Sequence, residues 1–420
     1  MTPILYHPWT HCCLGLSCVP PQSSFRSLMG DDVDKKDHIA PLTRPQDRDT
    51  FRSWALIWRR FQATAESGES SMGLFDVDMS ASRLPVSVIT GFLGSGKTTL
   101  LNKLLHHAGM GDSAVIINEF GEVPLDHLLV EAIEGEVAVL ASGCVCCTLR
   151  SDLEQTLRGL LARRDRGEVP AFSRILVETT GLADPAPIVQ LLLNNPLVSH
   201  FVRLDTVVTT VDAVNGLRHI DEHPEAVKQA ALADRLLLTK TDLAPPETIE
   251  DLQLQLVALN PGAARHVVTN GEIVPEALFG AALFDPSRKT VDVRRWINED
   301  AYGSEPHDHR DHEHRDHHHD INAFCLSCDQ PLSWEALSTW LGRLRHSAGD
   351  DLLRVKGILN LVGESAPVVI HGVHHIFHPP VLLHAWPDSD HRSRIVFIAR
   401  GIERAEIEAS FLEHVAGVRA

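Results

Sequence analysis

The sequence predicts an α/β fold with a mainly parallel sheet, followed by a smaller α+β domain. Three observations lead to this prediction. Between residues 85 and 285, short runs of β-branched and aliphatic residues alternate with helical patterns. The glycine-rich segment GFLGSGKT, residues 91–98, lies between the first such run and a helical pattern. After a histidine-rich stretch, strand-like and helical patterns continue in a shorter C-terminal region. Alternation of this kind favours a parallel sheet with helices on both faces.

The elements of the first domain follow from these local patterns. A buried strand is expected at residues 86–90, and a helix at residues 98–107 that ends at Gly109. The sequence SDLE at residues 151–154 is a capping box, which predicts a helix from Ser151 to about Arg164. Further strands are expected at residues 114–117, 137–140, 175–177, 207–211, 236–238 and 266–268.

The C-terminal region shows the same kinds of local pattern over about one hundred residues. Strands are expected at residues 321–327, 355–361, 368–371 and 395–399. Helices are expected at residues 333–346 and 403–415. These elements predict a second, smaller domain of α+β type.

Composition divides the chain into four segments. Residues 1–83 mix prolines and charge runs, so we expect a disordered extension or an over-long start, with Met72 or Met79 as the true first residue. Residues 84–298 form the first folded domain, residues 299–320 a histidine-rich linker, and residues 321–420 the second domain. The linker has seven histidines among residues 307–319. These imidazoles favour loose capture of divalent metals, and a solvated tether without a metal role is the alternative.

Charge and hydropathy exclude some partners. Against 56 acidic residues the chain has 38 basic ones, a formal charge of −18, which repels nucleic acid and anionic membranes and attracts cations. We find no run of 18 apolar residues and no secretory leader at the start. We therefore expect no nucleic acid, no membrane and a cytoplasmic location. The eight cysteines are grouped, which in such a chain indicates metal or redox chemistry before a disulfide framework.

The glycine-rich segment predicts a nucleotide site. It fits the P-loop pattern G-x-x-x-x-G-K-[ST] at every fixed position, between a strand and a helix. Its glycines allow backbone N–H groups to face phosphate, Lys97 reaches the outer phosphates, and Thr98 is placed to hold magnesium. The expected nucleotide-binding residues here are Gly91, Gly94, Ser95, Gly96, Lys97, Thr98 and Thr99.

A second segment predicts which base is bound. The strand at residues 236–238 leads into Thr239, Lys240 and Asp242, a T-K-x-D sequence. Asp242 is expected to accept hydrogen bonds from the guanine ring N–H and amine, with the stem of Lys240 along the purine. Adenine lacks these two donors and leaves the carboxylate unpaired, at a cost of about 1–3 kcal/mol. We therefore expect GTP rather than ATP.

A third segment predicts groups for hydrolysis. Glu178 lies at the end of the strand at residues 175–177, and Gly181 follows shortly after. Such a carboxylate can hold the magnesium shell or orient the attacking water, and the glycine lets the backbone approach the γ-phosphate. Lys97, Glu178 and Gly181 are the expected catalytic residues.

The segment GCVCC, residues 143–147, predicts a metal site. Cys144, Cys146 and Cys147 lie just before a predicted helix N-terminus, which lowers thiol pKa values and favours thiolates. Thiolates select zinc or other late transition metals. Three sulfurs this close in sequence rarely all bind one ion, so a further ligand from elsewhere is expected.

Together these motifs resemble one family, the CobW-like metallochaperone GTPases. The shared segments are residues 90–101, 118–122, 144–147, 178–185 and 239–242, and the resemblance extends over about residues 84 to 415 with a CobW C-terminal domain. The resemblance implies that Glu119 and Glu122 belong to a nucleotide-sensing switch segment. It also implies that Glu122 joins the cysteines in binding zinc. Some relatives have another glutamate where this chain has Ile117.

The function that follows is a GTP-hydrolysing metallochaperone that uses GTP, Mg²⁺ and Zn²⁺. Hydrolysis releases a switch segment beside the thiolates and so drives metal delivery to a client metalloprotein. Cobalt for cobalamin synthesis, nickel or iron are alternative metals, and a passive metal buffer is an alternative function. Homo-oligomerisation stays open. A second pair, Cys325 and Cys328, falls on a predicted strand that turns the two side chains to opposite faces, so we interpret it as structural. The histidines at 371, 374, 375 and 378 are expected to be strand and turn residues, with a metal relay as the alternative.

Overall fold

The structure is a computed structural model of the 420-residue chain. It describes residues 83–118, 138–142, 149–280, 296, 301–302, 321–383 and 385–417. All of these belong to one compact unit, Met72–Ala420. The predicted extension before residue 83 and the histidine tract at residues 307–319 lie outside the described residues.

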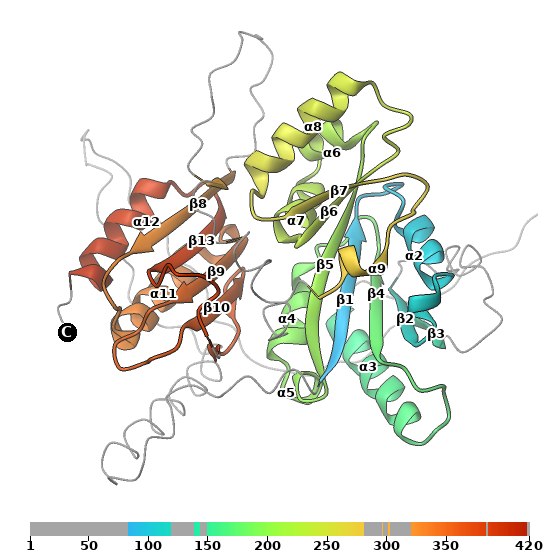
Figure 1. Cartoon of the computed structure of the whole chain (residues 1–420), viewed down its shortest axis with the longest axis horizontal. Helices are drawn as coiled ribbons and strands as arrows, with labels where there is room; N and C mark the ends of the chain where they lie inside the picture. The colour runs from blue at the N-terminus through green and yellow to red at the C-terminus, as the bar shows by residue number, and fades with distance from the viewer. Residues whose placement is uncertain are drawn as a thin grey trace, which may run out of the picture. The chain divides into compact units, whose positions relative to one another are not determined.

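The first sheet has seven strands, all parallel, in the order β3-β2-β4-β1-β5-β6-β7 (Figure 1). The strands are β1 (Leu84–Gly91), β2 (Ser113–Asn118), β3 (Ala138–Ser142), β4 (Arg174–Thr179), β5 (Val202–Asp212), β6 (Arg235–Thr239) and β7 (Ala264–Val268). Every strand predicted for this domain is present. Because the strands are parallel, their carboxyl ends meet at one edge, and the P-loop begins at that edge.

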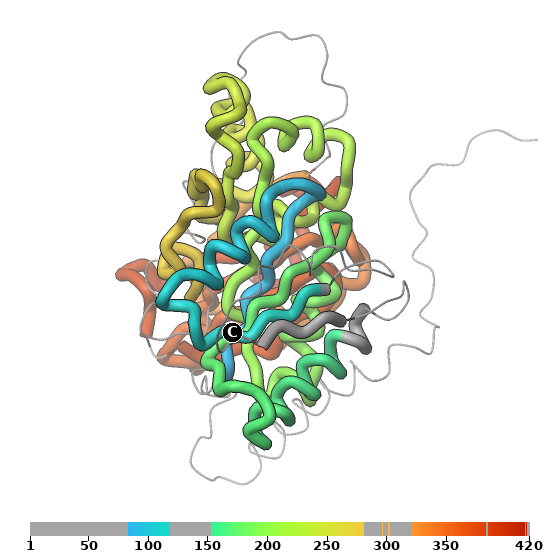
Figure 2. Tube along the Cα trace, turned by 90° about the vertical axis from the view of Figure 1, so that its right-hand side faces the viewer, coloured from blue at the N-terminus to red at the C-terminus, as the bar shows by residue number. Residues whose placement is uncertain are grey.

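Helices cover both faces of this sheet. They are α2 (Lys97–Leu105), α3 (Leu149–Asp165), α4 (Ala186–Asn194), α5 (Pro196–Ser199), α6 (Gly216–Glu222), α7 (Pro224–Leu232), α8 (Pro246–Leu259) and α9 (Pro275–Leu278). Figure 2 follows the chain from β1 into α2 and on to β2, in the blue to cyan part of the trace. The predicted start of α3 at Ser151 is wrong by two residues. Leu149 and Arg150 have high helix propensity and form its first turn, with the predicted capping box inside the helix.

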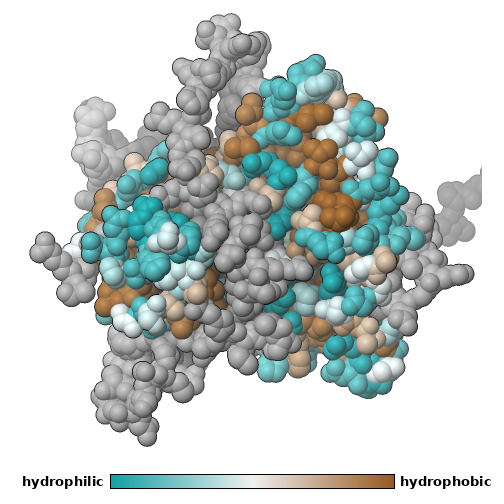
Figure 3. All heavy atoms as spheres, in the orientation of Figure 1, coloured by the Kyte–Doolittle hydropathy of each residue, from teal (hydrophilic) through white to brown (hydrophobic). Residues whose placement is uncertain are grey.

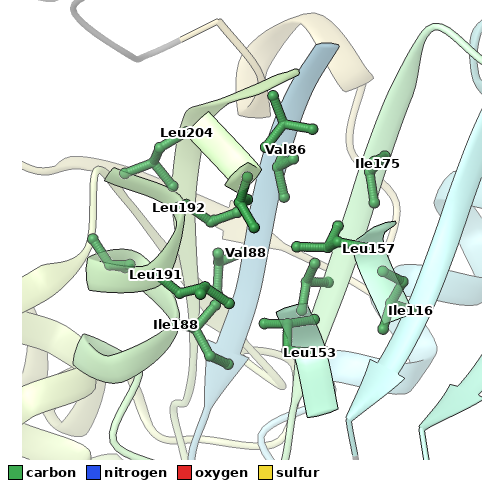
Figure 4. Packing of buried hydrophobic residues seen from close by; sticks show 14 of the residues in the cluster. Val86, Val88, Ile116, Leu153, Leu157, Ile175, Ile188, Leu191, Leu192 and Leu204 are labelled. Atoms are coloured by element: carbon green, nitrogen blue, oxygen red, sulfur yellow. The ribbon is translucent and has the colours of Figure 1, made fainter. Parts of the chain in front are cut away.

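Alternation along the central strands produces the two buried layers. Val86 and Val88 of β1 pack with side chains from α3 and α4 on one face, as Figure 4 shows for ten labelled residues. Ile89 points to the other face and packs with Leu100 and Leu104 of α2. Successive strand residues face opposite sides, so a strand buried on both faces reads as a continuous apolar run.

The C-terminal domain has an antiparallel six-stranded sheet. Its strands run in the order β11-β10-β9-β13-β8, and β12 also pairs with β10. The strands are β8 (Ile321–Cys328), β9 (Arg354–Leu359), β10 (Val368–Val373), β11 (Ile376–Phe377), β12 (Val381–Leu382) and β13 (Ser393–Arg400). Helices α11 (Trp334–Ala348) and α12 (Arg404–Phe411) follow the predicted positions, and Trp340 packs edge-on against Phe397 and Phe411.

Surface and cysteine positions complete this description. Among the described residues, none of the helices combines the length and apolar character that crossing a bilayer requires. The described residues on the face drawn in Figure 3 are mostly hydrophilic, with hydrophobic groups between them. Cys325 is buried and Cys328 half-buried on β8, and each thiol contacts a nearby backbone carbonyl. Their interpretation as structural residues stays a prediction.

Candidate nucleotide and metal site

The loop between β1 and α2 needs its glycines. Gly91, Gly94 and Gly96 have φ angles of 143°, 70° and 94°, in the region that glycine adopts without strain. A Cβ atom at Gly91 would lie 2.3 Å from the Thr210 side-chain oxygen and 2.4 Å from the Thr210 carbonyl oxygen. The loop therefore packs its backbone directly on β5, which is possible only with glycine at this position.

Lys97, the first residue of α2, binds this loop through its side chain. Its Nζ donates to the carbonyl oxygens of Gly91 at 3.0 Å and Phe92 at 3.2 Å, and the residue is 8% exposed. Two neighbouring strands brace the loop. The Ser95 hydroxyl is 2.7 Å from that of Thr210 on β5, and the Thr239 hydroxyl donates to the Ser95 carbonyl at 2.8 Å. The P-loop predicted from the sequence is therefore present, and hydrogen bonds hold it in place. Thr99, in the first turn of α2, is exposed.

Thr98 and Glu178 meet at the carboxyl edge of the sheet. The Thr98 hydroxyl donates to Glu178 Oε1 at 3.0 Å, and Glu178 is 2% exposed. Glu178 is placed there because β4 pairs with β1, with Ile89 in register with Glu178. A hydroxyl and a carboxylate oxygen in contact are the hard oxygen donors that magnesium prefers, so this donor set fits the ion.

The segment after β4 packs against the P-loop. A Cβ atom at Gly181 would lie 2.6 Å from Leu93 Cδ2 and 2.8 Å from Leu93 Cα. The neighbouring Thr180 hydroxyl is buried and, among the described residues, has no hydrogen-bond partner. A buried hydroxyl without a partner beside a P-loop is suited to an incoming phosphate oxygen, because leaving it unpaired costs about 1–3 kcal/mol.

The T-K-x-D segment follows β6 at the same edge. Lys240 has a φ angle of 56°, and its Nζ lies 2.9 Å from Asp212 Oδ2, at the end of β5. Asp242, two residues after Lys240, is exposed. Asn215 Nδ2 and the Val214 N–H also donate to Asp212. Burial acts to raise the pKa of Asp212, but these hydrogen bonds outweigh it and lower that pKa, so Asp212 is an anion that holds Lys240 in place.

Two features of the site were missed in the sequence. Asp212 is the last residue of β5 and directly follows the strand predicted at residues 207–211. A carboxylate at a strand end is the signal that identified Glu178, and Asp212 could have been found in this way. The ring of Phe92 in the P-loop lies 4.5 Å from each of the His219 and His223 rings. Burial and the nearby Arg218 lower the pKa of His219 and favour its neutral form. No local pattern predicts these ring contacts.

The expected zinc ligands lie outside the described residues. These are Cys144, Cys146 and Cys147 with Glu122, and also Glu119 of the predicted switch. Within the described part of the chain, no group of three or more His, Cys, Asp or Glu residues is placed to hold a metal ion.

The backbone nevertheless fixes where the two expected ligand segments leave the sheet. Asn118 ends β2 in register with Ser142, the last residue of β3, and with Thr179 of β4. Asn118 and Ser142, the last described residues before these segments, therefore lie at the edge of the sheet where Thr98 and Glu178 meet.

A parallel sheet, a braced P-loop and a strand-end carboxylate define the class: a P-loop nucleotide-binding protein. Two family models match the chain, the CobW/HypB/UreG nucleotide-binding domain over residues 85–267 and the cobalamin synthesis protein cobW C-terminal domain over residues 321–415. The chain belongs to the CobW/HypB/UreG family of P-loop GTPases, and the resemblance read from its motifs is confirmed.

Curated relatives and a solved structure agree with this assignment. The chain is 34% identical to the zinc chaperone YjiA of Escherichia coli over 328 residues, which cover 78% of this chain and 98% of the relative. It is 32% identical to the zinc chaperone CobW of Pseudomonas aeruginosa over 360 residues, 77% of this chain and 90% of the relative. The crystal structure of Zn(II)-bound YjiA GTPase from E. coli matches with a TM-score of 0.61 and 31% identity, over 80% of this chain and 99% of that one.

Proposed function

We propose that the chain is a GTP-hydrolysing metallochaperone that binds zinc through Cys144, Cys146 and Cys147 and delivers it to a client metalloprotein. The observation that supports this most directly is the register of three strand ends. Asn118 pairs with both Ser142 and Thr179, so the strands that precede the expected zinc ligands in the sequence end at the same edge of the sheet as the candidate nucleotide site. Relatives named zinc chaperones provide independent support.

GTP binding and hydrolysis use residues at the carboxyl edge of the first sheet. The P-loop backbone binds the phosphates, and Lys97 neutralises charge on the outer phosphates. Thr98 and Glu178 would hold magnesium, which would supply neutralisation of the negative charge on the outer phosphates. Gly181 lets the backbone approach the γ-phosphate, and Lys240 and Asp242 recognise guanine, with Asp212 holding Lys240.

Zinc binding uses the thiolates of the cysteine motif, with Glu122 as a further ligand. Zinc is the cargo in this mechanism, and thiolates bind zinc more favourably than they bind harder cations. Cobalt, nickel and iron share enough of this ligand preference to stay alternatives. We further propose a cytoplasmic location, since a reducing compartment keeps thiols available as ligands. Because hydrolysis removes the γ-phosphate contacts of the segment after β2, one of the zinc ligands changes its position when GTP is consumed.

Zinc release during a single turnover tests this function. We expect the full chain, loaded with less than one equivalent of zinc and with Mg²⁺ and GTP, to release zinc to a chromogenic chelator at the rate of phosphate release. A non-hydrolysable GTP analogue should prevent this release. Cys146→Ser should release its zinc at once with either nucleotide, whereas the matched control Cys328→Ser should behave as wild type. Equal release rates with GTP and its analogue would indicate a passive metal buffer instead.

A further inference from the structure

The side chain of Gln229 holds the loop that follows β4. Gln229 lies on α7 and is 1% exposed, and its Nε2 donates to the carbonyl oxygens of Gly181 at 3.2 Å and Ala183 at 3.0 Å. The amide orientation is fixed by chemistry, because a flipped amide would place Oε1 against two carbonyl oxygens. In the present orientation Oε1 is buried and finds no hydrogen-bond partner among the described residues. This residue leaves its own acceptor unpaired while it binds two carbonyls of the loop.

The neighbouring residue of α7 secures the far end of the same loop. Lys228 Nζ lies 2.8 Å from Asp184 Oδ2, and the other oxygen of Asp184 accepts from the Ala186 N–H at the start of α4. On its opposite side the loop contacts the P-loop through Gly181 and Leu93. The segment at residues 181–184 is therefore held between the P-loop and two consecutive residues of α7.

The C-terminal domain holds the C-terminal end of α7. The Arg354 guanidinium on β9 donates to the carbonyl oxygens of Leu232 and Ala233, the last residue and the cap of this helix. A cation at a helix C-terminus pairs favourably with the helix dipole and its free carbonyls. Within the first domain, Asn260 Nδ2 binds three carbonyls of the same helix end.

A buried ion cluster completes this attachment. Asp234, two residues after α7, contacts both the Arg354 guanidinium and Lys356 Nζ, the latter at 2.8 Å. Its other oxygen accepts from the Val207 N–H on β5. The loop beside the P-loop therefore contacts the middle of one nine-residue helix, and the C-terminal domain contacts the C-terminal end of the same helix.

We propose that Gln229 is a positioning residue for GTP hydrolysis and that Arg354 of the C-terminal domain holds its helix in the required position. Two carbonyls bound by one rigid amide fix the peptide planes of the loop, and with them the approach of Gly181 to the γ-phosphate. This inference rests on the proposed function, in which Gly181 lies beside that phosphate. GDP lacks the γ-phosphate, so its binding does not depend on Gln229.

The test separates turnover from nucleotide binding. Gln229→Glu keeps the shape of the side chain and removes both N–H donors. We expect a tenfold or greater loss of single-turnover GTP hydrolysis, with GDP affinity changed less than twofold. Lys228→Met removes the contact to Asp184 in the same loop and leaves the buried residues unchanged, because Lys228 is partly exposed. It should reduce hydrolysis about threefold and leave GDP affinity unchanged. Arg354→Met should reduce hydrolysis in the same direction.

A matched control variant accompanies this test, and different results would contradict the inference and the proposed function. Gln255 on α8 also donates through Nε2, to Asp221 at 2.9 Å, and Gln255→Glu should leave hydrolysis unchanged. Hydrolysis unchanged in both Gln229→Glu and Lys228→Met would overturn the inference and leave the proposed function in place. A parallel loss of GDP affinity would also overturn it, because it would show a general structural role. A wild-type chain without GTP turnover would remove the proposed function and this inference together.

Discussion

Lys97→Ala is expected to reduce GTP turnover by about 10²–10³-fold, the usual effect of removing one preorganised donor to developing charge. The ammonium lies under the P-loop, where it contacts the Gly91 and Phe92 carbonyls, and no other described lysine contacts these atoms. The change removes charge from a largely buried point beside the phosphates, where water screens it little. Phosphate release at saturating GTP measures the effect.

Lys103 provides the matched control for this change. It lies on the same helix, half exposed, with its Nζ 3.5 Å from Glu272. Lys103→Ala should keep nearly full turnover, because exposed ion pairs of this kind contribute little. If Lys97→Ala retained more than a third of wild-type turnover, the P-loop would not be the hydrolytic site.

Asp234→Asn is expected to lower the free energy of unfolding by about 3–5 kcal/mol, the cost of leaving buried charges without their partner. The two cations that it would strand are Arg354 and Lys356, each with a side chain at most 10% exposed. Burial acts to raise the pKa of Asp234, but these cations outweigh it and hold that pKa well below the usual 3.8. The stabilisation is therefore fully present above about pH 3.8 and is lost as the pH falls below it.

Denaturant unfolding at neutral pH measures this loss. Asp221→Asn, at an exposed carboxylate, is the control and should change stability by less than about 0.5 kcal/mol. Burial and Arg354 lower the pKa of Lys356 to about 8, which shows that its charge is already costly. The double variant Asp234→Asn/Lys356→Met should therefore recover part of the stability. If Asp234→Asn lowered the free energy of unfolding by less than about 1 kcal/mol, the charges of Asp234, Arg354 and Lys356 would not be shielded from water.

The sequence predicted the first domain well because its strands are buried on both faces. Continuous apolar runs such as residues 175–177 and 236–238 leave little choice of structure, and residues with a chemical role follow directly after them: Glu178 and Thr239 were found in this way. The spacing of the P-loop glycines reflects local backbone geometry, which sequence records directly.

Contacts between distant residues had no such signal. Gln229 lies 48 residues from Gly181, and Arg354 lies 120 residues from Asp234. In the sequence Gln229 is an ordinary polar residue of a helix, and only packing shows that it is buried. The predicted start of α3 at Ser151 was wrong because a capping box inside a helix looks the same in sequence as one at its end. The roles assigned to the cysteine motif and Glu122 stay predictions.

The affinity of the full chain for zinc in two nucleotide states tests the central claim most directly. Chelator competition with Mg²⁺ and either GDP or a non-hydrolysable GTP analogue gives the two affinities, and linkage makes any difference reciprocal. We predict that they differ by about tenfold, or about 1.4 kcal/mol, and that Cys146→Ser abolishes the difference while Cys328→Ser preserves it. Equal zinc affinities in the two states would contradict the coupling of nucleotide to metal on which the proposed function depends.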